Sequence, residues 1–359
     1  MSIKIHPGFK INGFSSGEED LKEIAYSLIK EGNKEEGIIG DFLLDWLSEE
    51  QSIRVSTSGS TGKPKLLDVE KEHMINSALA TSEFLGLEAG DRALLCLSAD
   101  YIAGKMMLVR SMTVGLDLDI VSPSKDPLEF VDKTYDFSAM VPLQAMASLS
   151  KLTQIKKLLI GGAPINSGLK EAISNTGIQN CFETYGMTET ISHIALKQVS
   201  NSNKSESPRP FVLLPHISIR TDERNCLIIN APTLSKETII TNDVVELVSE
   251  KEFYWLGRYD NLINSGGVKL LPEQIEAKLA SVLEKPFFIS SLPDEALGEK
   301  VILVIEGKED DACNESMARA QLDRYEQPKE IVFLTYFKRS NNGKILRQES
   351  LDVFLNSNN

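Results

Sequence analysis

The stretch STSGSTGKPK, residues 56–65, contains five hydroxyl side chains, two glycines, two lysines and one proline. Such a stretch adds nothing to an apolar core. Small hydroxyl and glycine residues let backbone N–H groups turn inward around an anion, and lysines add positive charge. The composition therefore predicts a phosphate-binding loop, and a surface turn that holds no ligand is the alternative.

The spacing within this loop differs from that of the phosphate-loop ATPases and kinases. Their loop requires glycine, four residues, Gly-Lys and then serine or threonine, followed directly by a helix. Here Pro64 follows Gly62-Lys63, and Thr57 stands where the first glycine would be. Pro64 also keeps the residue before it out of helical geometry, and the residues at 65–69 have the pattern of an extended strand. A phosphate-loop ATPase or kinase is therefore disfavoured.

Length, charge and composition limit the class of protein. The 359 residues suit two domains, and 42% hydrophobic with 25% charged residues allows a large core. A formal net charge of −14 argues against nucleic acid or an anionic membrane as the main partner. The first ten residues contain no signal-peptide pattern, and no stretch reaches the ~18 apolar residues of a membrane span. We expect a cytoplasmic protein in which Cys96 and Cys181 are buried free thiols.

Strand and helix patterns alternate after the loop. Between residues 92 and 162 they alternate at the pace of an α/β domain with a largely parallel sheet. From 217 to 258 the pattern changes to short β segments and turns. In the first part of the chain, helices are expected at 16–32, 38–50 and 69–87, and a strand at 53–55.

A second boundary falls at the polar, glycine-rich segment 257–267. The residues beyond it predict a compact α+β unit of about a hundred residues. We therefore expect an N-terminal domain at 1–256 and a C-terminal domain at 257–359. The expected elements of the second unit are helices at 272–284 and near 315–325 and strands at 286–292, 300–307 and 330–334.

The loop and four further motifs resemble the adenylate-forming superfamily, which includes acyl-CoA synthetases, peptide-synthetase adenylation domains and luciferases. The resemblance implies an α/β fold: a large N-terminal domain of α/β sheets plus a β subdomain, a small mobile C-terminal α+β domain and a hinge near residue 260. Most members are longer in front of the loop. The motifs, in the family's order, are STSGSTGKPK (56–65), TYGMTET (184–190), TNDVVEL (241–247), GRYDNLINSGGVKLLPEQIE (257–276) and NNGKILR (341–347).

The resemblance implies a reaction in two halves. A carboxylate attacks the α-phosphate of ATP to give an acyl-adenylate and pyrophosphate, and the thiol of coenzyme A then displaces AMP. Because two anions meet in the first half, cations and oriented donors should dominate the site. The expected ligands are ATP, Mg²⁺, coenzyme A and a small carboxylic acid, with no nucleic acid or membrane as partner. The oligomeric state is left open, with a homodimer as one option.

The resemblance also assigns the phosphate and adenine contacts. Tyr185, with Gly186 beside it, would lie against the adenine face. Thr188 would hydrogen-bond to the α-phosphate, and Glu189 would bind Mg²⁺ through its hard carboxylate oxygens. The alternative for Tyr185 is a core aromatic, which is the less favoured interpretation, whereas a glutamate in a helix, taken alone, is usually a solvated surface group. The residues expected around the β- and γ-phosphates are Thr57, Ser58, Gly59, Ser60, Thr61, Gly62 and Lys63.

Two further residues match the ribose contacts of the family. Asp243 would accept hydrogen bonds from the ribose hydroxyls, and Arg258 would be the second contact. The glycine that precedes this aspartate in the family is Asn242 here, which puts the local turn in doubt but leaves the carboxylate in place. Asp260 matches the hinge residue about which the small domain swings between the half-reactions.

The C-terminal motifs complete the implied site. Gly266 and Gly267 match a loop that lines the tunnel for the pantetheine arm, where the lack of a Cβ permits close approach. Lys344 matches the lysine that bridges the carboxylate and the α-phosphate during adenylation. Residues 328–347 are locally basic, which suits a polyanionic ligand. The family often has a proline where Lys338 stands, a departure that affects the approach to the turn.

The segments 99–115, 158–165 and 185–196 are most similar to the compact o-succinylbenzoate–CoA ligases of menaquinone biosynthesis. The resemblance implies o-succinylbenzoate as the acid, whose second carboxylate needs a cationic or donor-rich pocket. Many of those ligases have a histidine near the position of Tyr101, and this sequence has none there. The wall between the adenine and acyl pockets is expected at Gly161, Gly162 and Ala163. Candidates for the acid pocket are Tyr101, Lys105, Arg110 and His193, each with a surface or packing role as the alternative.

Three other functions are weighed against this one. A CoA ligase for another aryl or fatty acid, or an enzyme that loads a carrier protein, would share the chemistry. A nucleotide-binding protein without catalysis is less consistent with the sequence, because the matches to the family's Glu189, Asp243, Arg258 and Lys344 are intact.

Overall fold

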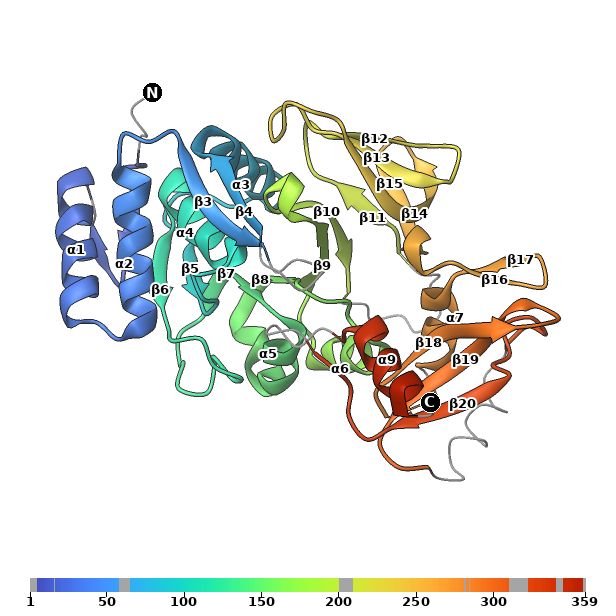
Figure 1. Cartoon of the computed structure of the whole chain (residues 1–359). Coiled ribbons are helices and arrows are strands. Elements are labelled where there is room, and N and C mark those ends of the chain that lie inside the picture. The colour runs from blue at the N-terminus through green and yellow to red at the C-terminus, as the bar shows by residue number, and fades with distance from the viewer. Residues whose placement is uncertain are drawn as a thin grey trace.

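The described chain forms a large N-terminal unit around a mixed sheet of thirteen strands and a smaller C-terminal unit around a sheet of five (Figure 1). A computed structural model describes residues 5–15, 17–57, 65–199, 209–280, 282–283, 285–309, 322–339 and 345–357.

Two packed helices occupy the N-terminal end of the large unit (Figure 1). They are α1 (Glu18–Glu31) and α2 (Lys34–Leu47), close to the expected ranges. Asn33 caps α2 because its side chain accepts hydrogen bonds from the backbone N–H groups of Glu35 and Glu36. Before these helices, the short strands β1 (Lys10–Ile11) and β2 (Phe14–Ser15) extend the edge of the large sheet beyond β6 (Asp117–Ile120).

The phosphate-loop sequence joins two strands of a separate hairpin. β3 (Ser52–Thr57) and β4 (Lys65–Glu70) are antiparallel, and Thr57 lies opposite Lys65 at the open end. The expected strand at 53–55 and the extended geometry after Pro64 are therefore confirmed. The helix expected from 69 begins two residues later, as α3 (Lys71–Leu85), because β4 continues through Glu70.

The central part of the large sheet is parallel, as the alternating pattern predicts. Its order is β6-β5-β7-β8-β9, and β6 and β7 lie on opposite sides of β5. The strand order thus reverses at β5, and in open α/β sheets ligands bind at the carboxyl ends of strands near such a point. The elements are β5 (Arg92–Leu95), α4 (Ile102–Val114), β6, β7 (Tyr135–Met140), α5 (Pro142–Ala147), η1 (Leu149–Gln154), β8 (Ile155–Ile160), α6 (Ser167–Thr176) and β9 (Asn180–Gly186).

The sheet continues beyond β9 as antiparallel strands, in the order β9-β10-β11-β15-β14-β13-β12. This is the expected β subdomain, and it shares one continuous sheet with the parallel part. Its elements are η2 (Thr188–Thr190), β10 (His193–Gln198), β11 (Phe211–Leu213), β12 (Ser218–Thr221), β13 (Cys226–Asn230), β14 (Ile239–Ser249) and β15 (Glu252–Arg258).

The second sheet begins after a single 3-10 turn. β15 pairs with β14 through Arg258, and η3 (Tyr259–Asn261) separates it from β16 (Ile263–Ser265). The domain division at 257 and the hinge at Asp260 stay predictions. The expected helix near 315–325 falls mostly outside the described residues. The remaining elements are β17 (Val268–Leu270), α7 (Pro272–Leu279), β18 (Phe287–Asp294), β19 (Gly298–Glu306), β20 (Glu330–Leu334) and α9 (Arg347–Ser357).

The two units contact each other through α7 and α6. Ser167 Oγ donates a hydrogen bond of 2.9 Å to the carbonyl of Ala280. Each unit has its own buried clusters, and the largest covers the N-terminal helices, α3, α4 and the β subdomain. None of the helices described here is long and apolar enough to cross a membrane.

Candidate nucleotide and acyl site

Four of the predicted nucleotide contacts lie on strands of the large sheet or directly after one. Tyr185 is the penultimate residue of β9, and Glu189 follows on the short helix η2. Asp243 on β14 and Arg258 on β15 are directly paired across the antiparallel ladder. A hydrogen bond between Tyr185 and Asp243 brings together two residues that are 58 positions apart in the sequence.

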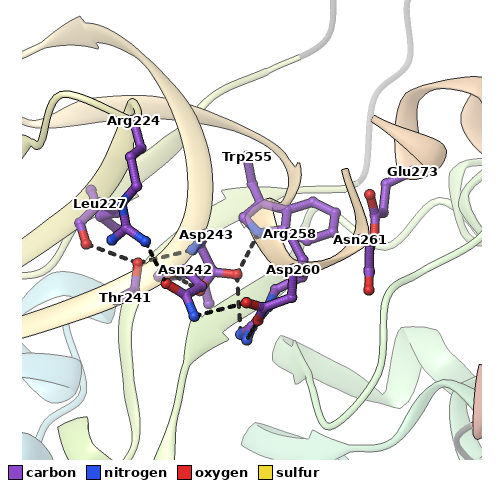
Figure 2. A network of polar contacts seen from close by, with 11 residues as sticks. Arg224, Leu227, Thr241, Asn242, Asp243, Trp255, Arg258, Asp260, Asn261 and Glu273 are labelled. Carbon is purple, nitrogen blue, oxygen red and sulfur yellow. Dashed lines mark hydrogen bonds and ion pairs between the residues drawn. The ribbon is translucent and has the colours of Figure 1, made fainter. Parts of the chain in front are cut away.

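The carboxylate of Asp243 is the centre of this group (Figure 2). Its Oδ2 accepts a hydrogen bond of 2.7 Å from the hydroxyl of Tyr185, and its Oδ1 accepts one of 3.1 Å from Nε1 of Trp255. Oδ1 also lies 3.6 Å from Nη1 of Arg258. Only 8% of the Asp243 side chain is exposed. These hydrogen bonds hold the buried carboxylate in one orientation.

Tyr185 links the predicted adenine contact to the predicted ribose contact. Its ring packs against Phe253 and Phe211, with centroids 5.2 and 5.7 Å away. Burial, together with the nearby Asp243 carboxylate, raises the pKa of Tyr185, so the phenol stays protonated and donates. The predicted contact of Tyr185 with adenine stays a prediction.

Asn242, the departure from the family's glycine, has a defined set of contacts (Figure 2). Its Nδ2 donates a hydrogen bond of 3.0 Å to Oδ1 of Asp260. Its Oδ1 accepts a hydrogen bond of 3.1 Å from Nη1 of Arg224. Nη2 of Arg258 donates a hydrogen bond of 2.8 Å to Oδ2, the other carboxylate oxygen of Asp260. The carboxylate of the predicted hinge residue is therefore held from both sides by residues of the large sheet.

Glu189 is exposed on η2, next to a backbone turn that hydrogen bonds of Thr190 stabilise. Buried Thr190 accepts from the N–H of Met187 (3.0 Å) and lies within hydrogen-bond distance of the carbonyls of Met187 and Ser192. Ile191 has a φ of 68° and is spanned by a 2.7 Å bond from Ser192 N to Thr190 O. A γ-turn with positive φ at a β-branched residue is strained, so the packing around Thr190 determines how Thr188 and Glu189 are presented.

Two predicted glycines are required by close approach of the backbone. A Cβ at Gly161, directly after β8, would clash with Thr184 Oγ1 on the neighbouring strand. A Cβ at Gly186 would lie 2.5 Å from the backbone of Ser192 and His193. Gly162 and Ala163 continue an exposed loop at the same edge of the sheet. These positions agree with the expected wall, and the pocket that it would bound stays a prediction.

Arg110 and His193 lie on either side of Thr81 in the interior of the large unit. Arg110 Nη2 lies 3.4 Å from Thr81 Oγ1, and His193 Nε2 lies 3.1 Å from the same oxygen. The Arg110 guanidinium also lies 5.3 Å from the ring of Phe137. Thr81 is a polar residue on the buried face of α3, which the sequence analysis did not single out.

Arg110 is buried without a counter-charge. It is 2% exposed, and within the described parts of the chain no carboxylate lies within ion-pair distance and Nε has no hydrogen-bond partner. Burial lowers the pKa of Arg110 to about 10. Burial and the Arg110 charge lower the pKa of His193 to about 3, so this imidazole is neutral near pH 7.

The other two acid-pocket candidates have different surroundings. The Lys105 ammonium donates to the carbonyl of Ala99 and lies 5.3 Å from the ring of Phe42 on α2, where burial lowers its pKa. Tyr101 occupies the N-cap position of α4 without a side-chain capping hydrogen bond, and it is 47% exposed. The contacts of the described residues therefore unite Arg110 with His193, and they place Lys105 against the N-terminal helices.

Several predicted residues belong to other parts of the chain. Gly266 and Gly267 form the turn between β16 and β17 with φ of 59° and 84°, a conformation that favours glycine. Thr57 ends β3, so the hairpin fixes both ends of the predicted phosphate loop. The residues of that loop from Ser58 to Lys63, and Lys344, lie outside the described residues.

The geometry can be compared with known proteins. A sequence profile for the family described as "AMP-binding enzyme" matches residues 55–225. The 2-succinylbenzoate–CoA ligases of Bacillus cereus and Lactococcus lactis are 26% and 25% identical, over 92% and 85% of this chain and 75% and 72% of their own lengths.

Solved structures agree with these matches. An acyl-CoA synthetase (AMP-forming)/AMP-acid ligase II-like protein from Dyadobacter fermentans is 36% identical, with a TM-score of 0.62 over 92% of this chain and 98% of that one. The O-succinylbenzoate coenzyme A synthetase of Bacillus subtilis, in complex with ATP and magnesium ion, has a TM-score of 0.73, and the match covers 92% of this chain and 82% of that one. At 22% identity this second likeness shows the fold alone.

Proposed function

This chain belongs to the family of AMP-forming acyl-CoA synthetases, and on that premise we propose that its acid substrate is 2-succinylbenzoate. The enzyme activates a carboxylate with ATP as an acyl-adenylate and then joins the acyl group to coenzyme A. 2-Succinylbenzoate has two carboxylates, so one is activated and the other must be bound unchanged. The product would enter menaquinone biosynthesis.

The observation that carries this proposal is the buried guanidinium of Arg110. A buried charge without a partner is destabilising, and such groups are usually paired. A fatty acid would leave Arg110 unpaired, because its only carboxylate is consumed at the phosphate. An acid with a second carboxylate would supply the missing partner through charge-assisted hydrogen bonds. The names of the curated relatives agree with such an acid.

His193 and Thr81 place neutral polar groups next to Arg110 in the proposed acid site. Because the His193 imidazole is uncharged near pH 7, it does not compete with Arg110 for the carboxylate but offers one donor or acceptor, according to its tautomer. The carbonyl group of 2-succinylbenzoate could accept a hydrogen bond here. We therefore assign Arg110 and His193 as acid contacts and keep Lys105 as a structural residue between α4 and α2.

In the first half-reaction, residues of the large sheet would hold the nucleotide while the acid attacks. Asp243 and Arg258 would hold the ribose, and Tyr185 would lie against the adenine. Donors of the loop at 58–63, assigned by its sequence, would surround the β- and γ-phosphates. The Thr188 hydroxyl would donate to the α-phosphate, and Lys344, assigned by its motif, would neutralise the charge that develops between the two anions.

The surroundings of Glu189 fit a magnesium ion that arrives with ATP. Among the described residues no cluster of three histidine, cysteine, aspartate or glutamate side chains could hold a metal. Glu189 is an exposed carboxylate next to the predicted phosphate site, and Mg²⁺ is typically bound by one or two carboxylates plus substrate phosphates and water. When bound, the ion would neutralise phosphate charge.

In the second half-reaction, the C-terminal unit would rotate about Asp260 so that the turn at Gly266 and Gly267 meets the pantetheine arm of coenzyme A. Because no Cβ projects from either glycine, the backbone there can approach a narrow chain. Such hinge motion is a common way for one site to serve two steps.

One assay tests the acid assignment. The purified protein is incubated with ATP, Mg²⁺, coenzyme A and either 2-succinylbenzoate or 4-oxo-4-phenylbutanoate, which lacks the ring carboxylate, and AMP and acyl-CoA are quantified. We expect kcat/KM for 2-succinylbenzoate to be about 100-fold higher, as the loss of a partner for a buried charge predicts. Equal use of the two acids, or a preference for a fatty acid, would contradict the assignment, and ADP in place of AMP would contradict the reaction class.

A further inference from the structure

Trp255 makes a contact that the proposed mechanism does not use. Its indole Nε1 donates a 3.1 Å hydrogen bond to Oδ1 of Asp243, the carboxylate assigned to the ribose. We propose that Trp255 is a positioning residue that orients this carboxylate for the ribose diol and so makes the enzyme select ribonucleotides over deoxyribonucleotides. The inference rests on the proposed role of Asp243 as the ribose contact.

The donors around Asp243 leave room for two ligand hydroxyls. A carboxylate can accept about four hydrogen bonds, two at each oxygen. Trp255 occupies one site on Oδ1 and the Tyr185 hydroxyl occupies one on Oδ2, at 2.7 Å. The fixed pair of neutral donors thus leaves about one lone pair on each oxygen, which matches the two vicinal hydroxyls of a ribose.

The Arg258 ion pair does not by itself fix the orientation of the carboxylate. Its closest recorded approach to Asp243 is 3.6 Å, whereas its Nη2 lies 2.8 Å from Asp260. The Arg258 side chain is also 43% exposed, which weakens the ion pair through solvent screening. Trp255 is a flat, two-torsion side chain that packs against the main core, so it holds its hydrogen bond at a lower cost in entropy.

A β-bulge gives Trp255 its direction. β14 and β15 pair Asp243 with Arg258 and Val244 with Gly257, but the register then shifts and Val245 lies opposite Trp255. Leu256 is the extra residue on β15. Because Val245 and Asp243 project from the same face of β14, the shift places Trp255 on that face. In an unbroken ladder Trp255 would project from the opposite face, away from the Asp243 carboxylate.

Two substitutions separate the N–H group of Trp255 from its bulk. Trp255→Phe keeps an aromatic ring and removes the donor. Trp255→His keeps an N–H at the corresponding ring position, because imidazole Nε2 superposes on indole Nε1, but loses more volume. If Trp255 only fills space, phenylalanine is the better substitute, and if it positions Asp243, histidine is. Trp46→Phe is the matched control, since Trp46 is the only other tryptophan and lies in α2.

The experiment measures Kd by calorimetric titration of the full chain with ATP, 2′-deoxy-ATP and 3′-deoxy-ATP. We expect the wild type and Trp46→Phe to bind ATP more tightly than either deoxynucleotide. Trp255→Phe should weaken ATP binding by about tenfold, as the loss of a hydrogen bond to a charged group predicts, and should barely change deoxynucleotide binding. Trp255→His should retain more of the preference for ATP.

Other outcomes separate the inference from the function on which it rests. A uniform loss of affinity for all three nucleotides in Trp255→Phe, or a better-preserved preference in phenylalanine than in histidine, would overturn the positioning role. A wild type that binds ATP and both deoxynucleotides equally would overturn it as well. Acid-dependent AMP release is measured in parallel with the wild type, and its absence alongside ribose-selective binding would refute the proposed ligase activity alone.

Discussion

Replacement of Arg110 by methionine should stabilise the ligand-free protein and abolish its preference for a dicarboxylic acid. Burial lowers the pKa of Arg110 from its ordinary value by more than two units, to about 10. At 1.36 kcal/mol per pKa unit, the folded state therefore bears a cost of about 3 kcal/mol for keeping this group charged near neutral pH. The sign follows because the folded pKa lies below the unfolded one while the group is charged in both states.

The interactions lost with the guanidinium offset part of this gain. The contact with the ring of Phe137 is worth about 1 kcal/mol, and the 3.4 Å contact with Thr81 is too long to add much. Thr81 still lies 3.0 Å from the carbonyl of Ser77, so it does not become unsatisfied. Methionine has a similar length and fills irregular space well. The net expectation is a stability increase of about 1–2 kcal/mol.

The assay combines urea unfolding with steady-state kinetics. Wild type, Arg110→Met and the control Lys105→Met, which removes the other cation of α4, are unfolded with and without 2-succinylbenzoate. We expect the acid to stabilise wild type and Lys105→Met but not Arg110→Met, since only a ligand that binds the native state shifts the equilibrium. The kcat/KM for 2-succinylbenzoate should fall about 100-fold in Arg110→Met.

The opposite stability change would refute this reasoning. Breaking an existing buried ion pair costs about 3–5 kcal/mol, so a loss of that size in ligand-free Arg110→Met would mean that Arg110 already has a counter-charge in the folded chain. An unchanged preference for the dicarboxylic acid would remove Arg110 from the acid site even if the stability rose. The His193 pKa provides a third measurement by NMR, and it should rise when the nearby charge is removed.

Three further changes test other parts of the protein. Lys344→Ala should abolish adenylate formation yet leave thioester formation from presynthesised acyl-AMP largely intact, and equal loss of both would contradict a two-orientation mechanism. Burial raises the pKa of Glu276 from 4.5 to about 7. The contribution of Glu276 to the free energy of unfolding should therefore fall by at most about 3 kcal/mol as the pH rises through this range. In urea unfolding from pH 5 to 8, the stability of Glu276→Gln should depend less on pH than that of the wild type. Asn242→Gly removes the bond to Asp260 and should speed the thioester half-reaction about twofold to tenfold, whereas an unchanged single-turnover rate would show that this bond does not restrain the hinge.

The elements of the fold could be predicted from local patterns. The loop at 56–65 is joined to extended residues because Pro64 excludes a helix on its N-terminal side, and β4 follows as expected. The alternation of strands and helices from 92 to 162 gives the parallel sheet. The predicted boundaries were displaced where a strand competes with a helix. The helical pattern includes Glu70, but this residue belongs to β4 because it pairs with Ser52 across the hairpin.

The candidate site could be predicted where chemistry follows from a residue in a motif, but not where it follows from register. Asp243 and Arg258 were assigned together, and the ladder pairs them directly. Trp255 stands three residues before Arg258 and would have been placed on the other face of the strand by simple alternation. The bulge at Leu256 places Trp255 on the same face as Asp243 instead, and the sequence FYWLGR contains no local pattern that predicts an extra residue.

The candidate residues for the acid show a different reason for incomplete prediction. Arg110 lies within MMLVRSM, and an arginine in an apolar helical run can either reach solvent or remain inside. Which of the two occurs depends on α3, β7 and β10, which enclose it from elsewhere in the chain. The sequence therefore provided four equal candidates for the acid, and only the packing separated Arg110 and His193 from Lys105.

The polar contacts around Asp243 would connect the predicted ribose contact to the predicted hinge residue, Asp260, through the side chain of Arg258. Arg258 approaches Asp243 at 3.6 Å and Asp260 at 2.8 Å, so any ligand hydroxyl that draws Arg258 towards the ribose must weaken its hold on the hinge carboxylate. Asn242 then holds Asp260 alone. A glycine in place of Asn242 would leave the hinge carboxylate free once Arg258 moved, whereas asparagine keeps a second restraint. If Asp260 is the hinge, as predicted, the asparagine at this position therefore adds a restraint that should slow the change of domain orientation.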